Sequence, residues 1–140
     1  MFQKDYILRM IEMLSDLIAA ILALIKKGDY KKASEQLQRV YYDMLKEDAA
    51  FFRKIEEEDL TNNLLQMHNY TNGHLEILAE LFNAEAELEL AQGNRDGSLK
   101  YSQKSLILFE FIDREQRTYS TDRVNKMAAI NDRINTLRNT

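Results

Sequence analysis

The first 27 residues repeat hydrophobic side chains at the intervals of an α-helix. One set alternates steps of four and three residues and comprises Ile7, Ile11, Leu14, Ile18, Ile21 and Ile25. A second set, at steps of seven, comprises Met10, Leu17 and Leu24. At about 100° per residue the two sets form neighbouring stripes, and with Leu8 and Leu22 they cover an arc of roughly 200°. The pattern predicts a helix over about residues 3–27 with more apolar surface than one neighbouring helix covers.

Three alternatives are open for what covers this excess surface. The last predicted helix could fold back over it, since that helix also has an apolar side. A second copy of the chain could instead pack first helix against first helix, with Met10, Leu17 and Leu24 as the expected dimer interface. The third alternative is attachment to a membrane surface. It is disfavoured because interfacial helices carry Lys and Arg on their polar face, whereas this helix places Glu12 and Asp16 there.

Glycines mark most of the other element boundaries, because the chain has no proline and four glycines. Gly28 is expected to end the first helix, with Asp29 placed to cap or charge the start of the second. Gly73 and Gly93 are expected to bracket a further helix. The predicted helices after the first cover about residues 29–46, 74–92, 96–114 and 120–138.

Residues 47–72 are the least regular part of the chain. We expect a short helix holding Ala49, Phe51, Phe52 and Ile55, and then another holding Leu60, Leu64 and Met67. The acidic run at 56–59 would lie near the start of the second helix, where negative charge is favoured. No stretch alternates with period two for long enough to form a strand. The sequence therefore predicts one all-α domain of six or seven helices, in a compact array or bundle.

The segments around two of the glycines share one design. Aligned on Gly28 and Gly93, which lie 65 residues apart, KKGDYKKASEQLQRVY and AQGNRDGSLKYSQKSL match at polar and small positions. In the second segment, Ser98, Ser102 and Ser105 form a narrow stripe that would let a neighbouring helix approach closely. Both segments predict a helical hairpin that turns at its glycine.

Residues 92–110, QGNRDGSLKYSQKSLILFE, resemble the turn and second helix of a tetratricopeptide repeat. The positions that fit are the turn (Gly93, Asn94), the small positions (Ser98, Ser105), the large positions (Tyr101, Leu106, Leu108) and, in the preceding helix, Phe82 and Ala86. Glu85 and Glu89 stand where apolar or aromatic residues are usual. In the earlier segment Gly28, Asp29, Tyr30 and Ala33 fit, whereas Val40 is larger than expected.

This resemblance implies tetratricopeptide-like hairpin units over about 3–46 and 74–114, a degenerate middle over 47–72 and a C-terminal helix over about 120–138. It also implies a scaffold or adaptor that binds a protein or peptide. The first 14 residues, MFQKDYILRMIEML, are in addition similar to the opening of a small bacterial helical family with no assigned activity.

Composition and charge narrow the classes of partner. The net charge of −4 gives no electrostatic reason to bind nucleic acid or an anionic membrane. The uninterrupted apolar run at 17–25 is too short to span a bilayer, which takes about 20 residues, and no cleavage site of a signal peptide follows it. We therefore expect a cytoplasmic protein. The absence of cysteine excludes disulfides and thiolate chemistry.

Candidate chemistry is sparse. His68 and His74 are spaced too widely for a metal pair on one helix, and we expect no catalytic, cofactor-binding or metal-binding residue. The carboxylates from Glu76 to Glu89 are expected to form a solvated face. The sequence thus favours a non-catalytic interaction module. The alternative is a small helical-bundle enzyme that uses carboxylates and a histidine.

Overall fold

The structure is a computed structural model of the chain, and it describes residues 2–67, 69–116 and 119–139. Within these residues it contains seven α-helices, one short 3₁₀-helix (η1) and no strand, which confirms the all-α prediction. The elements are α1 (Phe2–Lys27), α2 (Tyr30–Leu45), α3 (Ala49–Arg53), η1 (Glu57–Asp59), α4 (Asn62–Met67), α5 (Asn72–Ala91), α6 (Arg95–Glu115) and α7 (Thr121–Arg138).

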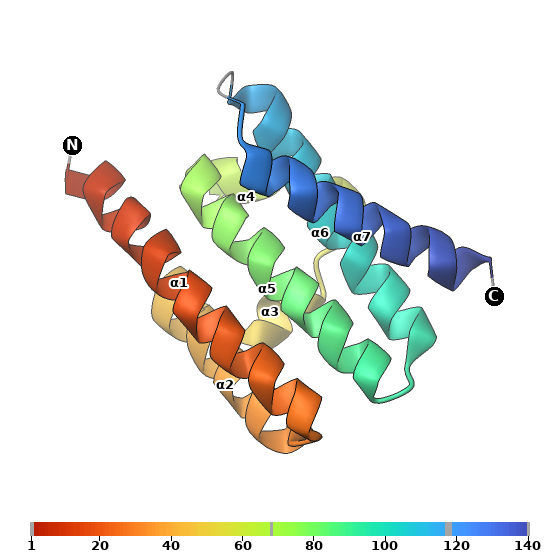
Figure 1. Cartoon of the computed structure of the whole chain (residues 1–140). Coiled ribbons are helices and arrows are strands. Elements are labelled where there is room, and N and C mark those ends of the chain that lie inside the picture. Colours follow the sequence, from red (N-terminus) through yellow and green to blue (C-terminus); the bar gives the residue numbers. More distant parts are fainter. Residues whose placement is uncertain (1, 68, 117–118, 140) are drawn as a thin grey trace.

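Helix α5 is the centre of the array (Figure 1). It packs against α1 and α2 on one side and against α6 on the other, while α7 packs on α6. Helices α1 and α5 run in the same direction, and α2 and α6 return antiparallel to them (Figure 1). The Ile7–Ile25 stripe of α1 is thus covered by α5 and α2. The C-terminal helix packs on α6 and does not fold back over α1, so that alternative is wrong.

Two glycines make the hairpin turns that the sequence predicts. Gly28 and Gly93 have φ angles of +84° and +85°, in the left-handed region where a Cβ atom is strained. After Gly93, the side chain of Asn94 accepts a hydrogen bond from the backbone N–H of Gly97 at 3.0 Å and caps α6. Asp29 occupies the equivalent position before α2, but its side chain makes no capping hydrogen bond.

Gly73 lies inside a helix and not just before its start, contrary to the prediction that Gly73 and Gly93 bracket a helix. Helix α5 begins at Asn72 with Thr71 as its N-cap, so Gly73 lies in the first helical turn. The constraint there is space, because a Cβ atom on Gly73 would lie 2.1 Å from the Cγ2 atom of Ile7. Glycine at this position lets the first turns of α1 and α5 approach closely.

The predicted small stripe of α6 is a packing surface. Ser98, Ser102 and Ser105 are fully buried. The Ser105 hydroxyl donates a hydrogen bond to the Ala79 carbonyl of α5 at 2.7 Å. The Ser102 hydroxyl accepts one from the Arg133 Nε of α7 at 2.8 Å. Short side chains on α6 thus let two helices dock on it.

Replacing Ser105 with leucine is expected to overpack the contact between α6 and α5 and to lower the free energy of unfolding by about 1–3 kcal/mol. Ser105→Ala is the matched control, because it removes the hydroxyl without adding volume and is expected to cost only about 1 kcal/mol. Urea unfolding of the three proteins measures both effects. If the leucine variant unfolds at the same urea concentration as the native chain, Ser105 does not face α5.

The start of α5 is closed by a capping box that includes a histidine. The His74 backbone N–H donates to the Thr71 hydroxyl at 3.4 Å, and the Thr71 backbone N–H donates to His74 Nδ1 at 3.0 Å. The imidazole also stacks on Tyr70, with ring centroids 4.7 Å apart. Burial lowers the pKa of His74 below its ordinary value of 6.5, which favours the neutral ring whose Nδ1 can accept.

Because the pKa of His74 is lowered in the folded chain, the free energy of unfolding should decrease as the pH falls. Because protonation is easier in the unfolded chain, the contribution of His74 is present above about pH 6.5 and is lost as the pH falls through and below that value. His74→Gln keeps a capping side chain but cannot titrate. We therefore expect the native chain to lose more stability than the glutamine variant between about pH 8 and about pH 5, in urea titrations. Equal losses in both proteins would contradict this assignment.

Candidate functional site

The two apolar stripes of α1 face different surroundings. In the first stripe, Ile7, Leu14, Ile21 and Ile25 are buried, and Ile11 and Ile18 are half-buried against the same core. This stripe faces the interior, as expected for the better aligned set. The second stripe lies on the side of α1 that adjoins α2, where the structure has an open groove.

The groove runs between α1 and α2 and has a cavity volume of about 540 Å³. Its apolar lining consists of Met10, Met13, Leu17, Val40 and Met44. Its polar lining consists of Tyr6, Arg9, Gln36, Arg39 and Asp43. Concave sites of this volume that combine apolar side chains with several polar groups are typical of binding sites.

The groove has a buried floor and an exposed rim. Met10 is 6% exposed and forms part of the floor, whereas Met13 and Tyr6 are 60% and 57% exposed. Leu17 is half-buried between the two. Large apolar side chains at such exposure lose free energy in water that burial by a partner would recover. The rim is therefore the part of the groove with most to gain from a partner.

The three residues predicted for a dimer interface share this side of α1 but differ in position. Met10 and Leu17 line the groove, while Leu24 is half-buried against the core and lies outside the lining. Tyr6 and Met13 also line the groove but were not predicted from the sequence. A signal was present, since Tyr6, Met10, Met13 and Leu17 follow each other at steps of four, three and four. The second wall of the groove, which α2 supplies, was not predicted either, because only the packing of α2 against α1 reveals it.

Both helices that form the groove carry exposed side chains of both charge signs. Arg9 and Asp16 lie on the exposed side of α1, and Arg39 and Asp43 on the exposed side of α2. None of these four side chains forms an ion pair with another side chain that the structure describes. Arg9, Arg39 and Asp43 line the groove, whereas Asp16 lies outside the lining on the exposed side of α1. Each helix therefore presents one charge of each sign to a partner.

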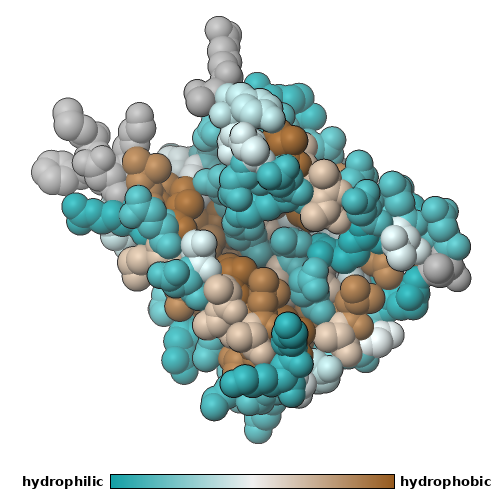
Figure 2. Space-filling view, in the orientation of Figure 1, coloured by the Kyte–Doolittle hydropathy of each residue, from teal (hydrophilic) through white to brown (hydrophobic). Residues whose placement is uncertain are grey.

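A second apolar region of α1 lies away from the groove. Leu8 and Leu22 are 51% and 38% exposed and are separated from the groove by the core stripe. Hydrophobic surface extends over α1 in the view of Figure 2, next to hydrophilic surface over most of the rest of that face. Because Leu8 matches Met13 in exposure and element, it offers a control for variants in the groove.

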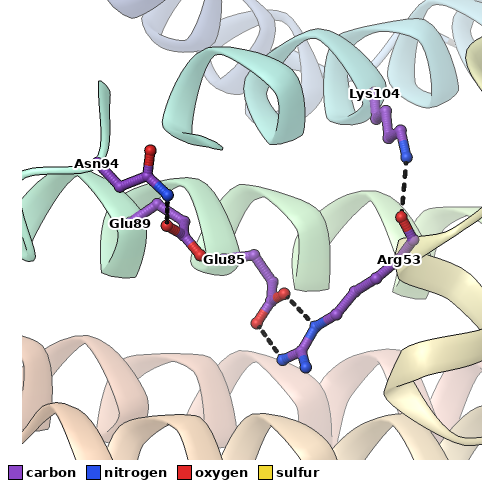
Figure 3. Close-up of polar contacts among 5 residues, drawn as sticks. All are labelled: Arg53, Glu85, Glu89, Asn94 and Lys104. Atoms are coloured by element: carbon purple, nitrogen blue, oxygen red, sulfur yellow. Dashed lines mark hydrogen bonds and ion pairs between the residues drawn. The ribbon is translucent and has the colours of Figure 1, made fainter. Parts of the chain in front are cut away.

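The carboxylates of α5 are not a simple solvated face, contrary to the prediction. Glu85 is 3% exposed, and its two oxygens accept hydrogen bonds from Arg53 of α3 at 2.6 and 2.8 Å (Figure 3). Lys104 of α6 donates to the backbone carbonyl of Arg53 at 3.2 Å. The pair therefore ties the irregular segment after α2 to both α5 and α6.

Three other carboxylates of α5, those of Glu80, Glu87 and Glu89, also make contacts beyond α5. Glu80 pairs with Lys126 and Glu87 with Arg133, both from α7. Glu89 accepts a hydrogen bond from Asn94 at 2.6 Å, as Figure 3 shows. These contacts join helices, and they account for much of the acidic surface that the sequence places on α5.

Glu85 is the most deeply buried of these carboxylates. Burial raises its pKa, while the hydrogen bonds and charge of Arg53 lower it. Burial also raises the pKa of the neighbouring Tyr41 well above 10, and the charge of Glu85 adds to that shift. With both oxygens held by a guanidinium, Glu85 is placed to stabilise the fold rather than to exchange protons with a substrate.

Neither of the two histidines is found in a catalytic arrangement among the described residues. His74 serves the capping box of α5. His68 lies outside the described residues. Among the described side chains, no three His, Cys, Asp or Glu residues are grouped so that they could hold a metal ion.

Two further findings concern features other than the groove. No α-helix among the described residues combines the length and hydropathy needed to cross a membrane. Comparison with known protein families, with curated proteins and with solved structures finds no match. The groove and its charges are therefore the features of the molecule that indicate a function.

Proposed function

We propose that this chain is a non-catalytic protein-interaction module that binds through the groove between α1 and α2. The observation that supports the proposal most strongly is the groove itself, with exposed Met13 and Tyr6 above a floor that includes Met10. Methionine side chains are flexible and polarisable, and they are common in surfaces that bind apolar residues of another protein.

The hairpin architecture agrees with this function. The resemblance of the Gly28 and Gly93 segments to tetratricopeptide repeats implies a scaffold whose hairpins present surfaces to a protein or peptide. The first hairpin, α1 and α2, carries the groove, and α5 packs against both of its helices. In this proposal the array holds the two walls of the groove at a fixed separation.

A site-specific photo-cross-linker tests the proposal in the native cell. A photoreactive phenylalanine analogue at Met13 is expected to give a discrete covalent adduct with a protein. The same residue at Ala129, which is exposed on α7, is the control and should give none. If Met13 gives no protein adduct, or if both positions give the same adducts, the groove is not the binding surface.

A further inference from the structure

We infer that the partner in the groove is a second copy of this chain, packed face to face so that α1 meets α1 and α2 meets α2, each pair antiparallel about one two-fold axis. The inference rests on the proposed function and names its partner. A closed two-fold contact is the commonest form of protein self-association, and it requires a surface that is complementary to itself.

The apolar part of the surface has the spacing of a helix seam. Tyr6, Met10, Met13, Leu17, Ala20 and Leu24 alternate steps of four and three residues. From Tyr6 to Leu24 the stripe is about 27 Å long at the rise of an α-helix. Two helices that pack along such a stripe bury its side chains between one another. Met13 lies near the middle of the Arg9–Asp16 segment and is the most exposed large side chain of the stripe.

The charges of α1 are self-complementary in this arrangement. Arg9 and Asp16 are exposed on one flank of the stripe and lie seven residues apart. In an antiparallel pair of α1 helices centred between residues 12 and 13, Arg9 of each copy lies opposite Asp16 of the other. Arg9 and Asp16 thus make two ion pairs across the axis.

The charges of α2 meet the same requirement independently. Arg39 and Asp43 lie one helical turn apart on its exposed side. Antiparallel α2 helices centred on residue 41 place Arg39 of each copy opposite Asp43 of the other. Both centres lie in the parts of the helices that form the groove, since residues 9, 13 and 17 of α1 line one cavity with residues 36, 39 and 43 of α2. The proposed two-fold axis passes near both centres.

This double self-complementarity favours a second copy over an unrelated protein. A uniformly acidic or uniformly basic partner would satisfy one sign of charge on each helix and leave the other sign facing a like charge or an apolar side chain, and an unrelated protein of mixed charge would need a matching pattern that a second copy already has. A second copy satisfies all four side chains at once. A second copy also covers the exposed rim of the groove, because the apolar rim of each copy packs against the apolar stripe of the other.

Charge reversal with complementary mixing tests the inference. In the Arg9→Glu variant, the acidic side chain at position 9 faces the acidic Asp16 of the other copy. In the Asp16→Arg variant, the basic side chain at position 16 faces the basic Arg9 of the other copy. Like charges therefore meet in both variants. Each variant alone should therefore dimerise at least about tenfold more weakly than the native chain. Both sites are exposed, and circular dichroism should show unchanged helix content. An equimolar mixture of the two variants should restore association as a heterodimer, which sedimentation velocity measures.

The outcomes are distinct. Restoration in the mixture, together with restoration in the Arg9→Glu/Asp16→Arg double variant, supports the two-fold arrangement, since every pair then joins opposite charges. A native chain that is monomeric, single variants that dimerise as well as the native chain, or a mixture that stays monomeric would each overturn it. If the native chain is monomeric but Met13 still cross-links a different protein, this inference fails while the proposed function stands. If Met13 cross-links nothing, the proposed function fails as well.

Discussion

Replacing Arg53 with methionine is expected to lower the free energy of unfolding by about 3–5 kcal/mol. The substitution leaves the Glu85 carboxylate buried at 3% exposure without the guanidinium that binds both of its oxygens. Removing one member of a buried ion pair is costly because the remaining charge must be desolvated or protonated. It also releases α3 from α5. Equilibrium unfolding in urea, followed by circular dichroism, measures the loss.

The double variant Arg53→Met/Glu85→Leu separates this mechanism from a loss of packing. When both charges are replaced by apolar side chains, most of the lost stability should return, since well-packed hydrophobic residues often replace a buried pair at little cost. Arg114→Met, at an exposed site on α6, is the matched control and should change little. A small effect of Arg53→Met, similar to that of Arg114→Met, would show that the pair does not hold the fold together.

Replacing Phe82 with alanine is expected to cost a similar amount, about 3–5 kcal/mol. Phe82 is fully buried in α5, and its ring lies 6.5 Å from that of Tyr41 and 5.7 Å from that of Tyr101, measured between centroids. These rings come from α2 and α6, so Phe82 joins both hairpins through one cluster. Its removal leaves a cavity where the two hairpins meet, and the loss should appear in the same urea titrations.

Phe82→Leu is the matched control for volume. It retains most of the buried apolar surface and should cost clearly less than the alanine variant. Tyr119→Ala, at a residue that is 74% exposed, should have almost no effect. Similar unfolding midpoints for Phe82→Ala and Tyr119→Ala would mean that Phe82 is not at the junction of the hairpins.

The sequence predicts the helices well because their signals are local. The period of apolar residues defines α1, and two glycines with positive φ angles end the first helices of the hairpins. Even the irregular segment at 47–72 divides into two short helices, although α3 ends at Arg53, before Ile55, and Leu60 precedes α4. Period and turn chemistry depend on residues within a few positions of one another.

The features that the sequence missed depend on residues far apart in the chain. Glu85 is buried because Arg53 lies beside it, and the two are 32 residues apart in sequence. Gly73 looked like a boundary, but its role is set by contact with Ile7 of another helix. The groove requires α2 as its second wall. No local pattern could reveal these three arrangements without the packing of α1, α3 and α5.

The mass of the native chain in solution tests the central claim most directly, namely that the groove between α1 and α2 binds a second copy. Light scattering during size exclusion, at micromolar concentration, should give twice the chain mass of 16.5 kDa. Met13→Glu should reduce that mass to one chain, because it places a charge in the apolar seam, while Leu8→Glu on the other flank of α1 should leave the dimer intact. A native mass of one chain, or equal loss of the dimer in both variants, would contradict the account.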